Sequence, residues 1–127
     1  MLFWNMLDMN KELTSDNNNY TQDELETYKE LDQVLVNRDI KSVFQPIVSL
    51  FDGEIFGYEA LSRGIPGSQL ERPDALFAAA ERFDKVWELE FLCRSKAFEK
   101  AYKLPKEKML FINVAPNIIN DARFQKG

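Results

Sequence analysis

Two charged side chains stand inside a stretch that otherwise has the composition of a buried strand. Glu59 and Arg63 belong to GYEALSRG, residues 57–64. Because side chains alternate along a strand, Glu59, Leu61 and Arg63 share one face. Such charges are costly to remove from water unless they are paired or bind something. Two interpretations are open: an ion pair within a strand at a sheet edge, or a site where the carboxylate holds a cation and the arginine holds a phosphate.

Two amide side chains repeat this pattern. Asn113 lies late in the apolar run LFINV, just before Pro116, which should end a strand. Its carbonyl oxygen is a hard donor suited to Mg²⁺, Mn²⁺ or Ca²⁺, and the alternative is a hydrogen bond to a neighbouring loop. Gln45 precedes Pro46 in another apolar run. Whether Gln45 belongs to the same site depends on how its strand pairs.

The elements that position these residues begin with a hairpin. The β-branched and aromatic runs 41–50 and 54–63 flank Asp52-Gly53, a strong turn signal. Thr21 and Glu24 form a capping box that predicts a helix over about 22–37. The other expected elements are a helix opened by Pro73 or Asp74, a long packed helix over 86–104 with Trp87, Phe91, Arg94 or Ser95, and Phe98 on one side, a strand over 108–116, and the start of another helix. This order predicts an α/β architecture with parallel strands after one antiparallel step.

The hairpin turn decides where Gln45 points. A two-residue turn would place Pro46 opposite Glu59 and turn Gln45 to the other face. A three-residue turn or a bulge would bring Gln45 opposite Leu61. We predict the longer turn or the bulge.

Composition narrows the classes of function. The net charge is −5, from 16 Lys and Arg against 21 Asp and Glu, which argues against binding DNA or RNA polymers. One Cys and no His exclude a zinc or iron–sulfur site built by one chain, and a reducing cytoplasm fits this Cys content. We expect Glu81, Glu88 and Glu90 to lie on solvated helix faces.

The length of 127 residues suits one domain. We expect a flexible leader over residues 1–20 and a folded body over 21–127. The leader lacks a basic start and is interrupted by Asp8, so we expect neither a signal peptide nor a membrane span. It is either a frayed or edge-packed end or, less simply, a segment that docks a partner.

Taken together, these blocks resemble a known family. FQPIVSLFDGEIFGYEALSR is similar to the opening of the EAL domain, a bacterial phosphodiesterase that cleaves cyclic di-GMP, and the similarity continues through RPDALFAAAE, LEFLCRSKAFEKA and LFINVAPNII to span about 30–127. The resemblance implies that Glu59 and Asn113 bind the catalytic Mg²⁺ or Mn²⁺ ions. It also implies that Gln45 and Arg63 contact the dinucleotide, and that Leu61 and Pro73 shape its pocket. Gly64 and Ala115 depart from the residues frequent in the family.

The implied fold is a partial (β/α)₈-like, TIM-type barrel with an antiparallel first strand, truncated to about its N-terminal half. A closed barrel takes roughly 250 residues. The further acidic ligands and the lysine that the family implies are absent, so we assign no catalytic residue and expect this fragment to be inactive alone. The alternatives are a non-catalytic cyclic di-GMP-binding or regulatory module and a structural oligomerisation fragment. Because half a barrel leaves strand edges unpaired, we expect a homo-oligomer.

Overall fold

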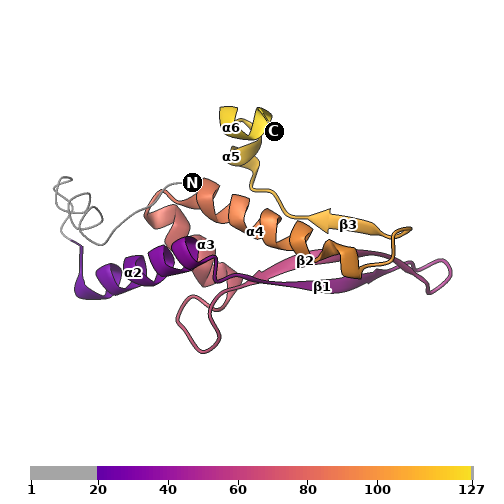
Figure 1. The fold of residues 1–127 in the computed structure, drawn as a ribbon, viewed down its shortest axis with the longest axis horizontal. Coiled ribbons are helices and arrows are strands. Elements are labelled where there is room, and N and C mark those ends of the chain that lie inside the picture. Colours follow the sequence, from indigo (N-terminus) through magenta and orange to yellow (C-terminus); the bar gives the residue numbers. More distant parts are fainter. Residues whose placement is uncertain (1–19, 127) are drawn as a thin grey trace.

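The first described helix begins where the capping box predicts. The computed structural model describes residues 20–126, so the predicted leader falls outside the described residues except for its last position. Helix α2 spans Gln22–Asn37 (Figure 1). The Thr21 hydroxyl accepts a hydrogen bond from the Glu24 N–H at 3.2 Å, and the Glu24 carboxylate accepts one from the Thr21 N–H at 2.9 Å. This reciprocal cap confirms the predicted boundaries.

Three strands form one sheet. Strands β1 (Lys41–Val48), β2 (Ile55–Arg63) and β3 (Met109–Ile112) lie in the order β1-β2-β3. The first pairing is antiparallel and the second parallel, as expected from the sequence. The third strand ends at Ile112, four residues earlier than predicted. Residues 113–115 therefore link β3 to the next helix without strand hydrogen bonds.

A bulge sets the register of the hairpin. Ile47 lies opposite Gly57, but Val48 lies opposite Ile55, so Phe56 is an extra residue in β2. The extra residue contacts Phe111 of β3, with ring centroids 5.8 Å apart. The predicted bulge is thus present, and it directs the Phe56 side chain toward Phe111.

The direction of the register shift differs from the prediction. Gln45 lies opposite Glu59, not opposite Leu61. Two features combine: the Ser49 N–H donates to the Glu54 carbonyl at 2.8 Å, which leaves four residues in the turn. The bulge at Phe56 then shifts the pairing by one residue. Because directly opposed residues share a face, Gln45 nevertheless joins the face of Glu59.

The other helical segments connect β2 to β3 and follow β3. They are α3 (Pro73–Arg82), α4 (Val86–Lys100), the 3₁₀ turn η1 (Ala101–Lys103), α5 (Pro116–Ile119) and α6 (Ala122–Gln125). Helix α4 runs along the strands and is tied to the sheet by Lys100 Nζ, which donates to the Ser42 carbonyl at 2.8 Å (Figure 1). Within residues 20–126 no helix is both long and apolar enough to span a bilayer.

The predicted packed face of α4 is wrong. Phe91 and Phe98 are 54% and 62% exposed, whereas Leu89 and Leu92 of the same helix are buried. The inward side is set by a cluster that α2, α3 and α4 share with the residues flanking the hairpin. Its buried members are Leu31, Val34, Ile40, Leu70, Leu76, Ala79, Ala80, Leu89 and Leu92. Aliphatic side chains thus fill the core, while Phe91 and Phe98 face outward and Trp87 is half-buried.

Candidate functional site

The polar residues singled out in the sequence gather on one face of the sheet. Glu59 is in the central strand, with Gln45 of β1 directly opposite and Phe111 of β3 on its other side. Leu61 and Arg63 continue the same face toward the end of β2. Helix α4 lies on the opposite face, where Cys93 lies near Ser62. The face that carries Glu59 is therefore not the face that α4 covers.

Glu59 and Asn113 meet directly. The Asn113 side-chain amide donates a hydrogen bond to Glu59 Oε1 at 3.0 Å, across 54 positions of sequence. Among the described residues, the second Glu59 oxygen and the Asn113 carbonyl oxygen accept no further hydrogen bond. The sequence prediction that these two residues converge is confirmed as geometry, and their ligand role stays a prediction.

Arg63 does not pair with Glu59. Its guanidinium donates to the Ser62 carbonyl at 2.9 Å, and within residues 20–126 it forms no ion pair. The interpretation of an ion pair inside an edge strand is therefore wrong, because β2 is also the central strand. A half-buried guanidinium that is not paired with a carboxylate can still bind an anion.

A cavity of about 440 Å³ opens where β2 and β3 separate. The two strands pair only as far as Ala60 and Ile112, and β2 continues alone to Arg63. Four predicted site residues line the cavity, namely Leu61, Arg63, Pro73 and Asn113. Glu59 and Gln45 do not line the cavity: Glu59 is bonded to Asn113, and Gln45 lies opposite Glu59 in the sheet. The structure thus places four of the six residues at a cavity that α4 also lines, and it joins Glu59 to one of them, Asn113.

Glu90 corrects one sequence prediction. It was expected on a solvated helix face, but it is only 5% exposed. Its carboxylate accepts hydrogen bonds from Arg94 at 3.1 Å and from the Ala115 N–H at 2.7 Å. The missed signal is helical spacing, because Glu90 lies three and seven positions before Cys93 and Ala97 on the stripe that lines the cavity. Of the other two glutamates, Glu81 is exposed and Glu88 is half-buried.

The donors in the site fit part of a hard-cation site. The Glu59 carboxylate and the Asn113 side-chain amide meet through the amide N–H, and each carries an oxygen that could bind a cation. Mg²⁺ commonly takes one or two carboxylates plus waters and substrate phosphates. The described residues hold no group of three or more His, Cys, Asp or Glu arranged for a metal. They could therefore provide some, but not all, of the ligands for such an ion.

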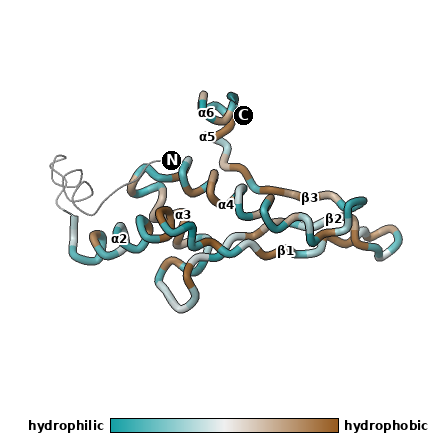
Figure 2. Tube along the Cα trace, viewed as in Figure 1, coloured by the Kyte–Doolittle hydropathy of each residue, from teal (hydrophilic) through white to brown (hydrophobic). Residues whose placement is uncertain are grey.

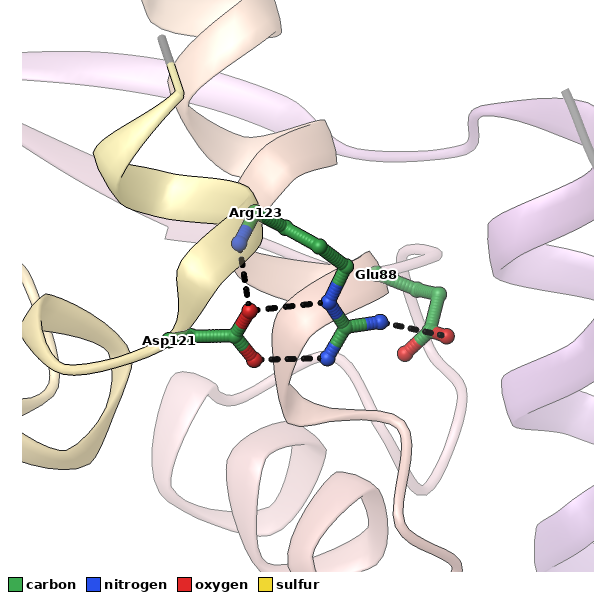
Figure 3. A network of polar contacts seen from close by, with 3 residues as sticks. All are labelled: Glu88, Asp121 and Arg123. Carbon is green, nitrogen blue, oxygen red and sulfur yellow. Dashed lines mark hydrogen bonds and ion pairs between the residues drawn. The ribbon is translucent and has the colours of Figure 1, made fainter.

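A second cavity, of about 290 Å³, is lined by charged side chains that pair with one another. Figure 3 shows the Arg123 guanidinium paired with the Asp121 carboxylate, with 2.7 Å between the closest nitrogen and oxygen. A second guanidinium nitrogen lies 4.0 Å from a Glu88 carboxylate oxygen. Arg123 also stacks over Trp87, 4.4 Å from the ring centre. Its side-chain and backbone hydrogen bonds lower the pKa of Asp121 to about 2. This network ties α6 to α4 and pairs the charges of the second cavity with one another.

Comparison with known proteins agrees with this architecture. Residues 28–126 match the sequence profile of the EAL domain. The solved EAL domain of Xanthomonas citri FimX in complex with c-diGMP superposes with a TM-score of 0.67 at 20% identity, covering 83% of this chain and 42% of that one. The Pseudomonas aeruginosa FimX EAL domain bound to c-di-GMP gives a TM-score of 0.65 at 20% identity, covering 79% of this chain and 41% of that one. No curated protein sequence gives a significant match.

A third solved structure, the phosphodiesterase PaMucR in a c-di-GMP complex, gives a TM-score of 0.59 at 22% identity, covering 80% of this chain and 43% of that one. The chain thus spans less than half the length of these structures. Its fold is part of a (β/α)₈-like barrel with an antiparallel first strand. The chain belongs to the EAL domain family.

Proposed function

We propose that this chain provides the N-terminal part of a cyclic di-GMP site in an EAL-type phosphodiesterase. Glu59 and Asn113 would hold a divalent cation, Mg²⁺ or Mn²⁺, which when bound polarises the phosphodiester. Arg63 would take a phosphate, with Gln45 as a second polar contact. Leu61 would form the apolar wall of the cavity, beside Pro73 at the start of α3.

The hydrogen bond between Asn113 and Glu59 carries this proposal. It brings a carboxylate of β2 and the amide group of a residue just after β3 together, next to the cavity that Asn113 and Arg63 line. A cation at this point would lie near an anion held by an unpaired guanidinium, which is the arrangement that a metal-assisted phosphodiester site requires. The cyclic di-GMP in the solved relatives gives the same ligand class independently.

Calorimetry with cyclic di-GMP, with and without Mn²⁺, tests the proposal. We expect binding that strengthens with Mn²⁺, loss of that strengthening in Glu59→Ala, and an affinity lower by roughly ten- to hundred-fold in Arg63→Ala. Glu54→Ala and Arg82→Ala change exposed charges outside the cavity and should bind as the wild type does. Wild-type binding in both Glu59→Ala and Arg63→Ala would contradict the assignment of these residues.

A non-catalytic binding role for the isolated chain is favoured by the number of ligands. Two donors cannot enclose Mg²⁺, and the described residues offer no further acidic cluster. We therefore expect cyclic di-GMP to bind to the 127-residue chain and remain intact, as monitored by chromatography of the nucleotide after incubation with Mn²⁺. Release of linear dinucleotide by the purified chain would overturn this expectation. The cytoplasmic location stays a prediction.

Self-association is a further part of the proposal. Both β1 and β3 are edge strands, and Figure 2 shows the apolar colour along β3, where Met109 is 53% exposed. Open apolar edges favour pairing with another chain. We expect a concentration-dependent dimer in sedimentation analysis that Met109→Lys weakens and Val36→Lys, on α2, does not. A monomer at all concentrations would refute this part.

A further inference from the structure

The link between β3 and α5 is held by few contacts. Asn113, Val114 and Ala115 follow the last strand residue and precede Pro116, the first residue of α5. Their hydrogen bonds within the described residues go from the Asn113 amide to Glu59, from the Ala115 N–H to Glu90, and from the Ile118 N–H to the Ala115 carbonyl. Only the bond to Glu90 reaches a helix on the far side of the sheet.

Glu90 is suited to hold this link in place. One carboxylate oxygen accepts the Ala115 N–H at 2.7 Å, and the other accepts Arg94 at 3.1 Å, so both oxygens are oriented. The Glu90 side chain is 6% exposed, and Arg94 itself lies 5.3 Å from the ring centre of Phe124. A charge-assisted bond to a buried, doubly anchored carboxylate is stronger than one to a neutral acceptor.

We infer that Glu90 is a positioning residue that sets Asn113 beside Glu59. The bond to Ala115 fixes the chain two residues after Asn113, and α4 in turn is anchored through the buried Leu89. Without this bond the link is free to swing, and the Asn113 amide then loses its fixed approach to the Glu59 carboxylate. The importance of Glu90 for function rests on the proposed cation site. The test of its positioning role does not depend on that site.

Amide hydrogen exchange in the full chain tests the inference without any ligand. In Glu90→Ala, the protection of the Ala115 N–H, divided by that of the core Leu89 N–H in the same variant, should fall roughly ten- to hundred-fold. The side-chain amide resonances of Asn113 should move toward those of a solvated Asn. Dividing by Leu89 removes any change in global stability.

Two more variants keep the test decisive. Glu90→Gln retains an acceptor oxygen without the charge, so it should reduce the same protection ratio by a smaller factor, roughly two- to ten-fold. If Glu90→Ala does not fold, this variant provides the test. Leu92→Ala removes a buried contact of α4 away from the link and should leave the ratio and the Asn113 resonances unchanged. Wild-type values in every folded Glu90 variant would overturn the inference.

Mn²⁺ separates this inference from the proposed function. Wild-type chain should show paramagnetic broadening at Asn113, and Glu90→Ala should require more Mn²⁺ for the same broadening. If the wild type shows none, the cation site is refuted, while the exchange ratio still decides the role of Glu90.

Discussion

Gly64 follows Arg63 at the point where the chain turns away from the sheet. A Cβ atom built there would lie 2.1 Å from the Leu70 carbonyl oxygen. Carbon atoms normally rest about 3.5 Å from their neighbours. Gly64→Ala therefore forces the backbone apart by more than roughly 1 Å and breaks the bond from the Gly64 N–H to Glu71, now 2.9 Å long.

The expected loss of unfolding free energy is about 2 kcal/mol. Overpacking against the backbone costs about 1–3 kcal/mol, and the lost hydrogen bond costs about 1 kcal/mol. Alanine also lowers the conformational entropy of the unfolded chain, which stabilises the folded state by about 0.4–1 kcal/mol. Urea unfolding followed by far-UV circular dichroism measures the change. The same displacement moves the loop that leads to Pro73, so we also expect the cavity wall to shift.

Gly53 supplies the matched control. Nothing lies within 4 Å of a Cβ built at Gly53, but its φ of +72° is left-handed. Gly53→Asn, which tolerates that conformation, should stay within about 0.5 kcal/mol of the wild type. Gly64→Asn should be at least as destabilising as Gly64→Ala. A Gly64→Ala chain as stable as the wild type would refute the steric argument.

Three further predictions concern the core and the titratable groups. Leu76→Ala, at a fully buried position, should lower the unfolding free energy by about 2–5 kcal/mol, whereas Leu50→Ala, on the exposed loop, should leave it within about 0.5 kcal/mol in the same urea assay. The Arg123 hydrogen bonds lower the pKa of Asp121 from 3.8 to about 2, so its stabilising contribution is present above pH 3.8 and is lost as the pH falls toward 2. A carboxyl ¹³C titration should show that low pKa and its return toward 3.8 in Arg123→Ala, and an unchanged pKa there would refute the pairing. Burial raises the pKa of Cys93, so iodoacetamide should alkylate the folded chain more slowly than the urea-unfolded chain, and equal rates would contradict the burial.

Part of the fold could be predicted from the sequence because it depends on contacts between residues close together in the chain. The Thr21 and Glu24 pair fixed the start of α2 because each side chain satisfies the other residue's N–H. The two apolar runs around Asp52-Gly53 identified the hairpin, and the alternation of side chains placed Glu59, Leu61 and Arg63 on one face. These inferences needed only contacts between near neighbours in the chain.

Features that depend on distant packing were not readable in the same way. The four-residue loop and the bulge at Phe56 together set the register, and no local rule predicted that combination. The inward side of α4 was set by the aliphatic core of α2 and α3, so the aromatic spacing of Phe91 and Phe98 misled. Glu90 carries a charge typical of a surface, and its burial follows from Arg94 and the Ala115 N–H, which the sequence does not place.

The core cluster and the candidate site have no residue in common. The buried aliphatic set lies among α2, α3 and α4, while Gln45 and Glu59 share the face of the sheet that α4 does not cover, and Asn113 is bonded to Glu59. Mutations can therefore erase or alter the chemistry with little loss of folding free energy. Such a scaffold allows evolution to convert an enzyme into a receptor, or a receptor into a pure scaffold, by a few substitutions on one surface.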